Sequence, residues 1–160
     1  MNLERLVNLV VARLVEREQR VYSVSLPQLR LGLEPAVYLQ HATLHLLLPD
    51  PDFMQQLATG NSAEPAVAAL HEAWSWGLRV HISLHQQLLR TLPRQALQRL
   101  PLSLSDHQGQ PVRLSASRLL SYGDIATLGP CWLIISPKAR VTPLAQDYLS
   151  ARRIQLLRQE

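Results

Sequence analysis

The chain has 160 residues, of which 47% are hydrophobic and 18% are charged, a balance typical of one ordinary globular domain. A domain of this length buries about two-thirds of the surface that its unfolded chain exposes, so it needs no disulfide bond or structural metal to fold. The formal net charge is +4, but the 16 basic residues, Lys138 and fifteen arginines, are scattered along the whole chain without forming a basic stripe, which argues against nucleic-acid binding.

Three further features bear on the cellular compartment. The longest strongly apolar stretch, Leu44 to Leu48, is much shorter than the roughly 20 residues that cross a membrane as a helix. The N-terminus lacks the basic segment, apolar core and small-residue cleavage site of a secretory signal. The single cysteine, Cys131, begins an apolar segment and is expected to be a small buried residue without a disulfide partner. We therefore expect a cytoplasmic protein with no membrane partner.

Residues 1 to 18 are expected to form an amphipathic N-terminal helix, with helical spacing over residues 2 to 18. Its apolar stripe consists of Leu3, Leu6, Val7, Val10 and Leu14. Full burial of these five side chains would contribute roughly 8 to 15 kcal/mol, whereas ordering the backbone costs about 1 to 2 kcal/mol per residue. The helix is therefore expected to dock, either on its own domain or on a partner. Residues 19 to 160 are expected to form a single α/β domain.

The segment from residue 21 to residue 100 alternates between strand and helix patterns, separated by proline, glycine and asparagine. The pattern predicts strands at 21–26 and 78–84, one or two strands within 36–48, and a loop at 27–35. It predicts short helices at 53–58, 64–76, 86–92 and 95–100.

A hairpin and a short helix are predicted next. Strands at 102–104 and 112–114 flank a turn that contains Gly109. Ser121 is expected to cap a short helix over residues 122–128.

A strand–helix–strand unit is predicted at the end of the chain. The apolar run from Trp132 to Ile135 predicts a buried strand, and Thr142 and Pro143 provide an N-cap hydroxyl and a proline in the first helical turn. The helix from Pro143 is expected to bury Leu144, Tyr148 and Ala151, and it leads into a strand at 154–157.

This alternation of strands and helices favours an α/β fold. We expect one compact domain with a mixed, partly parallel sheet and flanking helices, preceded by the amphipathic helix. The parallel part should include the two strands of the C-terminal unit, because a helix joins them.

The histidines are the first candidates for chemistry. His41 and His45 share a face if they lie on one strand, and so do His81 and His85. Four imidazoles could converge on a metal ion if the two strands were neighbours. However, no thiolate or carboxylate lies at ligand spacing nearby, so these histidines are weak candidates and no metal is expected.

No other residue pattern supports catalysis. Asp124 and Asp147 each lie near the start of a predicted helix, where a carboxylate stabilises the helix dipole. Trp74, Trp76 and Trp132 are expected to be core or partner-facing residues. Because the chain lacks dinucleotide-binding, phosphate-loop and nucleophile-elbow motifs, no catalytic residue and no cofactor are assigned, and the chain is not expected to be an enzyme.

Several stretches resemble the PduM family of propanediol-utilisation microcompartment proteins, along essentially the whole chain. These stretches are Gln40 to Leu44, His71 to Ala73, Gly77 to Val80, Ser83 to His85, Gln87 to Leu89, Leu100 to Leu102, Leu120 to Tyr122 with Asp124, Val141 to Ala145 with Asp147, and Ile154 to Leu156. A glycine often precedes the isoleucine in the last pattern, whereas this chain has Arg153 at that position.

The resemblance implies a non-catalytic structural protein needed for assembly or stability of the bacterial microcompartment that degrades 1,2-propanediol. It also implies contact with a shell protein of that compartment, such as the minor shell protein PduK. The apolar stripe of residues 2–18 is the expected contact, because short amphipathic helices commonly dock into hydrophobic grooves.

One alternative is a small-ligand or cofactor-binding protein, or a divergent enzyme, of the same pathway. In such a protein Ser136 and Thr142 would lie near the carboxyl ends of strands, where α/β folds bind ligands.

Overall fold

The computed structural model describes residues 2 to 160, and it shows an α/β fold built on a mixed seven-stranded sheet. Its elements follow the chain in this order: α1 (Leu3–Gln19), β1 (Val21–Ser25), α2 (Leu26–Arg30), α3 (Pro35–Gln40), β2 (Thr43–Leu47), α4 (Pro51–Thr59), α5 (Pro65–Ser75), β3 (Arg79–Leu84), the 3-10 helix η1 (Gln86–Thr91), α6 (Arg94–Gln98), β4 (Leu102–Asp106), β5 (Pro111–Leu114), β6 (Leu119–Leu120), α7 (Tyr122–Ile125), β7 (Trp132–Ile135), β8 (Arg140–Val141), α8 (Pro143–Ala151) and β9 (Gln155–Arg158).

The large sheet has the strand order β1-β2-β3-β4-β5-β7-β9. Strands β1 to β4 are parallel, β4 and β5 form an antiparallel hairpin, and β5, β7 and β9 are again parallel. The predicted mixed sheet, hairpin and parallel C-terminal unit are therefore confirmed. Strands β6 and β8 form a separate two-stranded parallel sheet, which was not predicted because each strand has only two residues.

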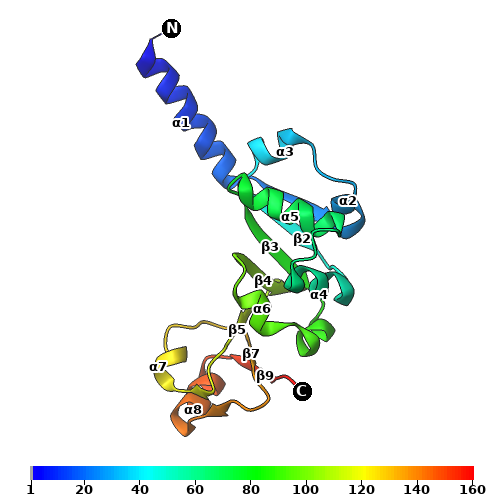
Figure 1. Cartoon of the computed structure of the whole chain (residues 1–160). Helices are drawn as coiled ribbons and strands as arrows, with labels where there is room; N and C mark the ends of the chain where they lie inside the picture. Colours follow the sequence, from blue (N-terminus) through cyan, green and yellow to red (C-terminus); the bar gives the residue numbers. More distant parts are fainter. Residues whose placement is uncertain (1) are drawn as a thin grey trace.

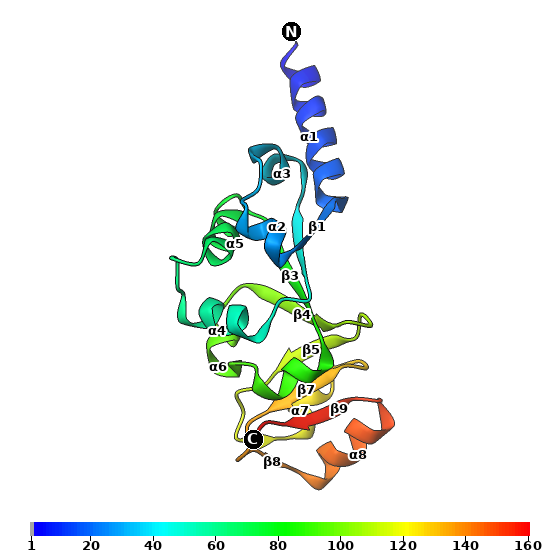
Figure 2. The same ribbon diagram turned by 90° about the vertical axis from the view of Figure 1, so that its right-hand side faces the viewer.

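The direction reversal between β4 and β5 explains why the helices lie on two faces. Parallel crossovers are almost always right-handed, so the helices that connect β1 to β4 lie on one face of the sheet. The strands after β4 run the opposite way while the sheet continues to grow in the same direction. A right-handed crossover from β7 to β9 therefore places α8 on the other face, and Figures 1 and 2 show this arrangement.

Two hydrophobic clusters follow from this arrangement. The first lies between β1–β5 and the helices α2 and α4 to α6, with Phe53, Leu70 and Ile82 among its fully buried side chains. The second lies between β7 and α7 and α8. Successive residues of β7 point to opposite faces, so Ile134 belongs to the first cluster and Leu133 to the second. Cys131 is buried in the second cluster, as expected.

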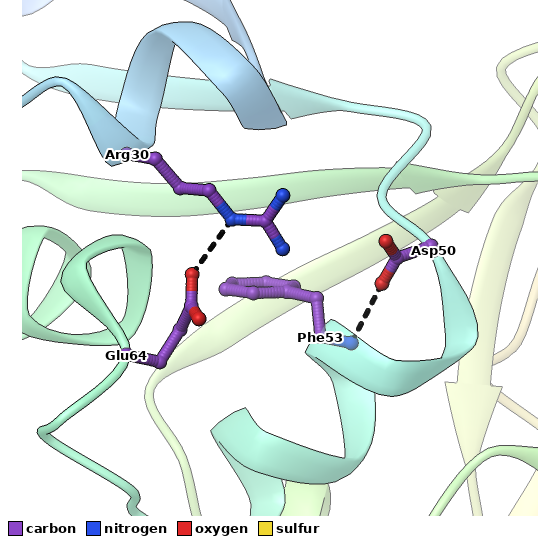
Figure 3. A network of polar contacts seen from close by, with 4 residues as sticks. All are labelled: Arg30, Asp50, Phe53 and Glu64. Carbon is purple, nitrogen blue, oxygen red and sulfur yellow. Dashed lines mark hydrogen bonds and ion pairs between the residues drawn. The ribbon is translucent and has the colours of Figure 1, made fainter.

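Short polar contacts fix the helices over the first cluster. Asp50 caps α4 because its Oδ1 atom accepts a hydrogen bond of 2.7 Å from the backbone N–H of Phe53. Arg30, at the end of α2, donates a hydrogen bond of 2.8 Å to Glu64, which precedes α5. Figure 3 shows both contacts on either side of the Phe53 ring, which is fully buried.

The sequence-based assignment was wrong in two segments near the N-terminus. Residues 27–35 were predicted as a loop, but α2 begins at Leu26, where Ser25 and Gln28 form a capping box. The region 36–48 was predicted as one or two strands, but its first part is the helix α3, which Pro35 initiates. Only the second part forms a strand, β2.

The predicted helix α8 is confirmed, and Tyr148 is half-buried against the second hydrophobic cluster, but Leu144 and Ala151 were wrongly predicted to be buried. Thr142 caps it, as expected, by accepting a hydrogen bond of 3.2 Å from Ala145 N–H. The helix buries Ala145 and Leu149, whereas Leu144 is 61% exposed and Ala151 is also exposed. The composition of the helix allows either face, and the crossover that joins β7 to β9 selects the face that meets the sheet.

Candidate functional site

Helix α1 is the most unusual feature of the molecule, because none of its apolar side chains is buried. No residue of α1 is buried, and Figure 1 shows the helix extending away from the sheet and from the other helices. The five residues of the predicted stripe are between 43% and 74% exposed: Leu3, Leu6, Val7, Val10 and Leu14. The helix was therefore predicted correctly, but it does not pack on its own sheet.

Three further apolar side chains of α1 are as exposed as the predicted stripe. Leu9, Val11 and Val15 are 52%, 51% and 57% exposed. At 100° per residue, all eight apolar positions together cover about two-thirds of the circumference of the helix. This wider apolar surface could have been predicted from the sequence, because these three residues flank the predicted stripe on the helical wheel.

Polar contacts at its C-terminal end hold α1 in place. Arg17 is half-buried, and its Nη2 atom donates hydrogen bonds to the backbone oxygens of Tyr38 (3.3 Å) and Trp76 (3.1 Å). Glu18 forms an ion pair with Arg79 at the start of β3. These contacts attach the C-terminal end of α1 to α3, α5 and β3, whereas its apolar side chains stay exposed.

The three tryptophans occupy separate places. Trp76 is 44% exposed and stacks on Tyr38 beside the C-terminal end of α1, with ring centroids 6.0 Å apart. The indole N–H of Trp74 donates to Pro101 O, and that of Trp132 donates to Asp106 Oδ2, at 3.0 Å in each case. Trp74 and Trp132 therefore belong to the core and its edge, as expected.

The structure brings two of the four candidate histidines together. Strands β2 and β3 are neighbours, and the register pairs His45 with His81, with ring centroids 5.0 Å apart. His41 lies outside the strands, because α3 ends before it, and its ring Nδ1 is 2.9 Å from Val37 O. His85 stacks on His107 of the β4–β5 turn at 4.7 Å. Within residues 2–160, no group of three or more His, Cys, Asp or Glu side chains could share a metal ion.

His45 and His81 belong to a hydrogen-bonded cluster on the uncovered face of the sheet, which we name the histidine–serine cluster: His45, His81, Ser83, Ser103 and Ser105. The ring of His81 contacts two hydroxyl groups, Ser103 Oγ at 2.6 Å and Ser105 Oγ at 2.8 Å. His45 Nε2 lies 2.6 Å from Ser83 Oγ, which is 3.2 Å from Ser105 Oγ. The alternating pattern of β3 and β4 puts these side chains on one face, but only the register shows that they touch.

Burial lowers the pKa of both imidazoles in this cluster. Desolvation is the main cause, and for His81 the nearby His45 lowers the pKa further. Both rings are therefore neutral near pH 7, so each can donate one hydrogen bond and accept another.

Three of the four aspartates and hydroxyl groups considered as candidates form hydrogen bonds within their own turn or helix end. Asp124, inside α7, accepts hydrogen bonds from the N–H and Oγ–H of the N-cap residue Ser121, both at 2.9 Å, and these bonds lower the pKa of Asp124. Asp147 is exposed on α8. Ser136 Oγ accepts a hydrogen bond from Lys138 N–H, and Thr142 caps α8. The structure does not bring these four residues together with the histidine–serine cluster.

One buried carboxylate was not recognised in the sequence. Asp106 is 2% exposed and accepts hydrogen bonds from Trp132 Nε1–H and from the N–H groups of Gln108 and Gln110. Burial raises its pKa, but these hydrogen bonds, with one from Gln86, outweigh that effect and lower the pKa overall. Asp106 therefore stays ionised and fixes the β4–β5 turn. The role of Asp106 could have been predicted from its position at the start of the Asp-His-Gln-Gly turn.

Within residues 2–160, no helix combines the length and the apolar content needed to cross a bilayer. No solved structure matches the chain significantly.

Comparison with known proteins identifies the family. A family model described as "PDU_like: Putative propanediol utilisation" matches residues 5–155. The chain is 41% identical to a protein of Salmonella typhimurium named "Bacterial microcompartment assembly protein PduM", over 99% of this chain and 97% of that protein. It is 40% identical to the protein of the same name from Citrobacter freundii, with the same coverage of both chains. On this evidence, the chain belongs to the PduM family.

Proposed function

We propose that this protein is a non-catalytic structural protein needed for assembly or stability of the bacterial microcompartment that degrades 1,2-propanediol. It resides in that compartment, within the cytoplasm, and acts by inserting α1 into an apolar groove of a shell protein. The names of the two relatives and the description of the matching family support the assembly role. The observation that carries the contact is that none of the apolar side chains of α1 is buried.

The energetics favour a groove over a flat surface. Full burial of a Leu or Val side chain contributes about 1.5 to 3 kcal/mol, and the side chains of α1 are already about half covered by the helix itself. Burying the exposed half of the five stripe residues would therefore contribute roughly 4 to 8 kcal/mol. All eight apolar residues would contribute roughly 6 to 12 kcal/mol, compared with an association cost of about 4 to 15 kcal/mol. A partner that contacts both flanks of the helix therefore gains more binding free energy than one that covers the stripe alone.

The attachment of α1 suits such insertion. Because Arg17 and Glu18 hold only the C-terminal end, a partner can reach the apolar surface without displacing any part of the sheet. A free helix of this length is marginally stable in water, so a groove that buries its apolar face would also stabilise the helix.

A pair of matched double variants of the full chain tests the proposal. Val10→Glu with Leu14→Glu places two carboxylates on the apolar surface, whereas Asn8→Glu with Ala12→Glu places them, at the same spacing, on the polar face. Both are produced in cells that form propanediol-degrading microcompartments, and the fraction that co-purifies with intact compartments is measured. We expect the co-purifying fraction to be at least tenfold lower for the first variant than for the unsubstituted chain, and unchanged for the second variant.

Three further measurements complete the experiment. Circular dichroism of the purified variants checks that the fold is retained, and cross-linking in compartments identifies the shell protein that α1 contacts. Deletion of residues 1–18 should also abolish co-purification. If the deleted chain remains folded and still co-purifies with shells, the docking role of α1 is wrong. If the apolar-face variant changes only the oligomeric state of the purified protein, α1 binds a second copy of this chain instead of a shell protein.

A further inference from the structure

The sheet opens between β4 and β5, at the strand reversal that separates the two halves of the molecule. These strands pair at only two positions, Leu104 with Val112 and Ser105 with Pro111. Beyond them, a cavity of about 520 Å³ occupies the space between the diverging strands. This volume lies within the range of small-molecule sites in proteins.

Side chains of α6 keep the two strands apart. Gln98 Nε2–H donates a hydrogen bond of 3.2 Å to Leu114 O, and Arg94 Nη1–H donates one to Ser115 O. These bonds bind the carbonyl groups at the end of β5 to α6, while β5 pairs with β7 on its other side. The opening is therefore fixed by specific contacts.

Two kinds of side chain line the cavity. Ser103, Ser105 and Arg113 alternate with apolar residues along β4 and β5, so the histidine–serine cluster and Arg113 lie on one face of the sheet. The leucines belong to the first hydrophobic cluster on the other face: Leu97, Leu100, Leu102 and Leu114. A ligand that contacts both groups has a hydrogen-bonding head group and a short apolar chain.

The charged side chains that line the cavity indicate the charge of the ligand's head group. Arg113 is exposed and forms no ion pair with any residue from 2 to 160. No Asp or Glu is found among the described residues that line the cavity. A guanidinium group and hydroxyl groups are common donors to carboxylate and phosphate oxygens.

We propose that this cavity binds a small organic anion, with its oxyanion head at Arg113 and the histidine–serine cluster and its short aliphatic chain among the leucines. The lowered pKa values of His45 and His81 agree with a functional role, because titratable groups with perturbed pKa values gather at binding sites. The described residues that line this cavity do not include those that hold α1, so the proposal does not depend on the proposed assembly role.

Titration of the ¹⁵N-labelled full chain, followed by NMR, tests the proposal. The ligands are butyrate, butyl phosphate, acetate and butyramide, the last being a neutral analogue of butyrate. We expect saturable shifts at the backbone amides of Ser83, Ser103 and Ser105 with butyrate or butyl phosphate, and the tighter of the two identifies the head group. Butyramide should bind at least tenfold more weakly than butyrate. Acetate, which lacks two methylene groups, should bind about tenfold more weakly as well.

Two arginine variants provide the matched control. Arg113→Gln should weaken butyrate binding at least tenfold, because it removes the charge at the head-group end. Arg118→Gln makes the same change at another exposed arginine, which does not line the cavity, and should leave binding unchanged. The proposal is overturned if neither oxyanion produces saturable shifts at the cluster, if butyramide binds as tightly as butyrate, or if the two variants have equal effects.

Discussion

Replacement of Arg153 by glycine is expected to stabilise the protein. Arg153 has a φ angle of 57°, in the left-handed region that favours glycine. It follows the C-cap Arg152 of α8, and the next residue, Ile154, donates its N–H to Leu149 O at 3.1 Å. This is the Schellman arrangement, in which the residue after the C-cap is usually glycine. The glycine of the wider family pattern therefore has a structural explanation, and this chain tolerates an arginine in its place.

The size of the expected stabilisation follows from the backbone conformation at residue 153. A non-glycine residue in the left-handed conformation costs roughly 1 to 2 kcal/mol, whereas glycine raises the entropy of the unfolded chain by roughly 0.5 to 1 kcal/mol. The net gain of Arg153→Gly should be about 0.5 to 1 kcal/mol. For a chain of this size, that corresponds to a rise in Tm of roughly 1 to 4 °C.

Urea unfolding of three chains measures the effect: the unsubstituted protein, Arg153→Gly and Arg153→Ala. The alanine variant removes the same exposed side chain, and its cation near the helix C-terminus, without relieving the backbone strain. Glycine should therefore exceed alanine by about 1 kcal/mol in the free energy of unfolding. Equal stability of the glycine and alanine variants would refute the assignment of strain to this position.

Two other predictions concern the second hydrophobic cluster and the histidine–serine cluster. Leu149→Ala should lower the free energy of unfolding by about 2 to 5 kcal/mol, because Leu149 is only 1% exposed. Leu144→Ala, on the exposed side of α8, should change the free energy of unfolding by less than about 0.5 kcal/mol. Similar losses for the two variants in urea unfolding would contradict the observed helix orientation. The lowered pKa values of His45 and His81 mean that, below the unfolded pKa of about 6.5, the unfolded chain binds more protons than the native chain. The contribution of the two histidines to stability is complete above about pH 6.5 and is lost as the pH falls toward their native pKa values. Urea unfolding at a series of pH values should show this loss of stability, and the loss should be smaller for His81→Gln.

Local sequence patterns were sufficient to predict most elements and the family. The period of two in Arg79–Leu84 identifies β3, and the Thr142–Pro143 pair identifies the start of α8. Such signals act within one or two turns of the chain, so they do not depend on the rest of the fold. The error at α2 came from a proline-bounded segment read as a loop, and the error at α3 came from apolar residues read as a strand, although proline in a first helical turn initiates a helix.

Contacts between distant segments could not be read from these patterns. The sequence by itself determined that α1 is amphipathic and that β3 alternates polar and apolar side chains, because both follow from the period of one element. Only the tertiary structure decided that the apolar side chains of α1 stay exposed and that His81 contacts His45, Ser103 and Ser105. Likewise, only the tertiary structure showed that α8 lies on the opposite face and that a cavity lies beside the β4–β5 pair. Strand order and register set these contacts, and they depend on the packing of the whole sheet.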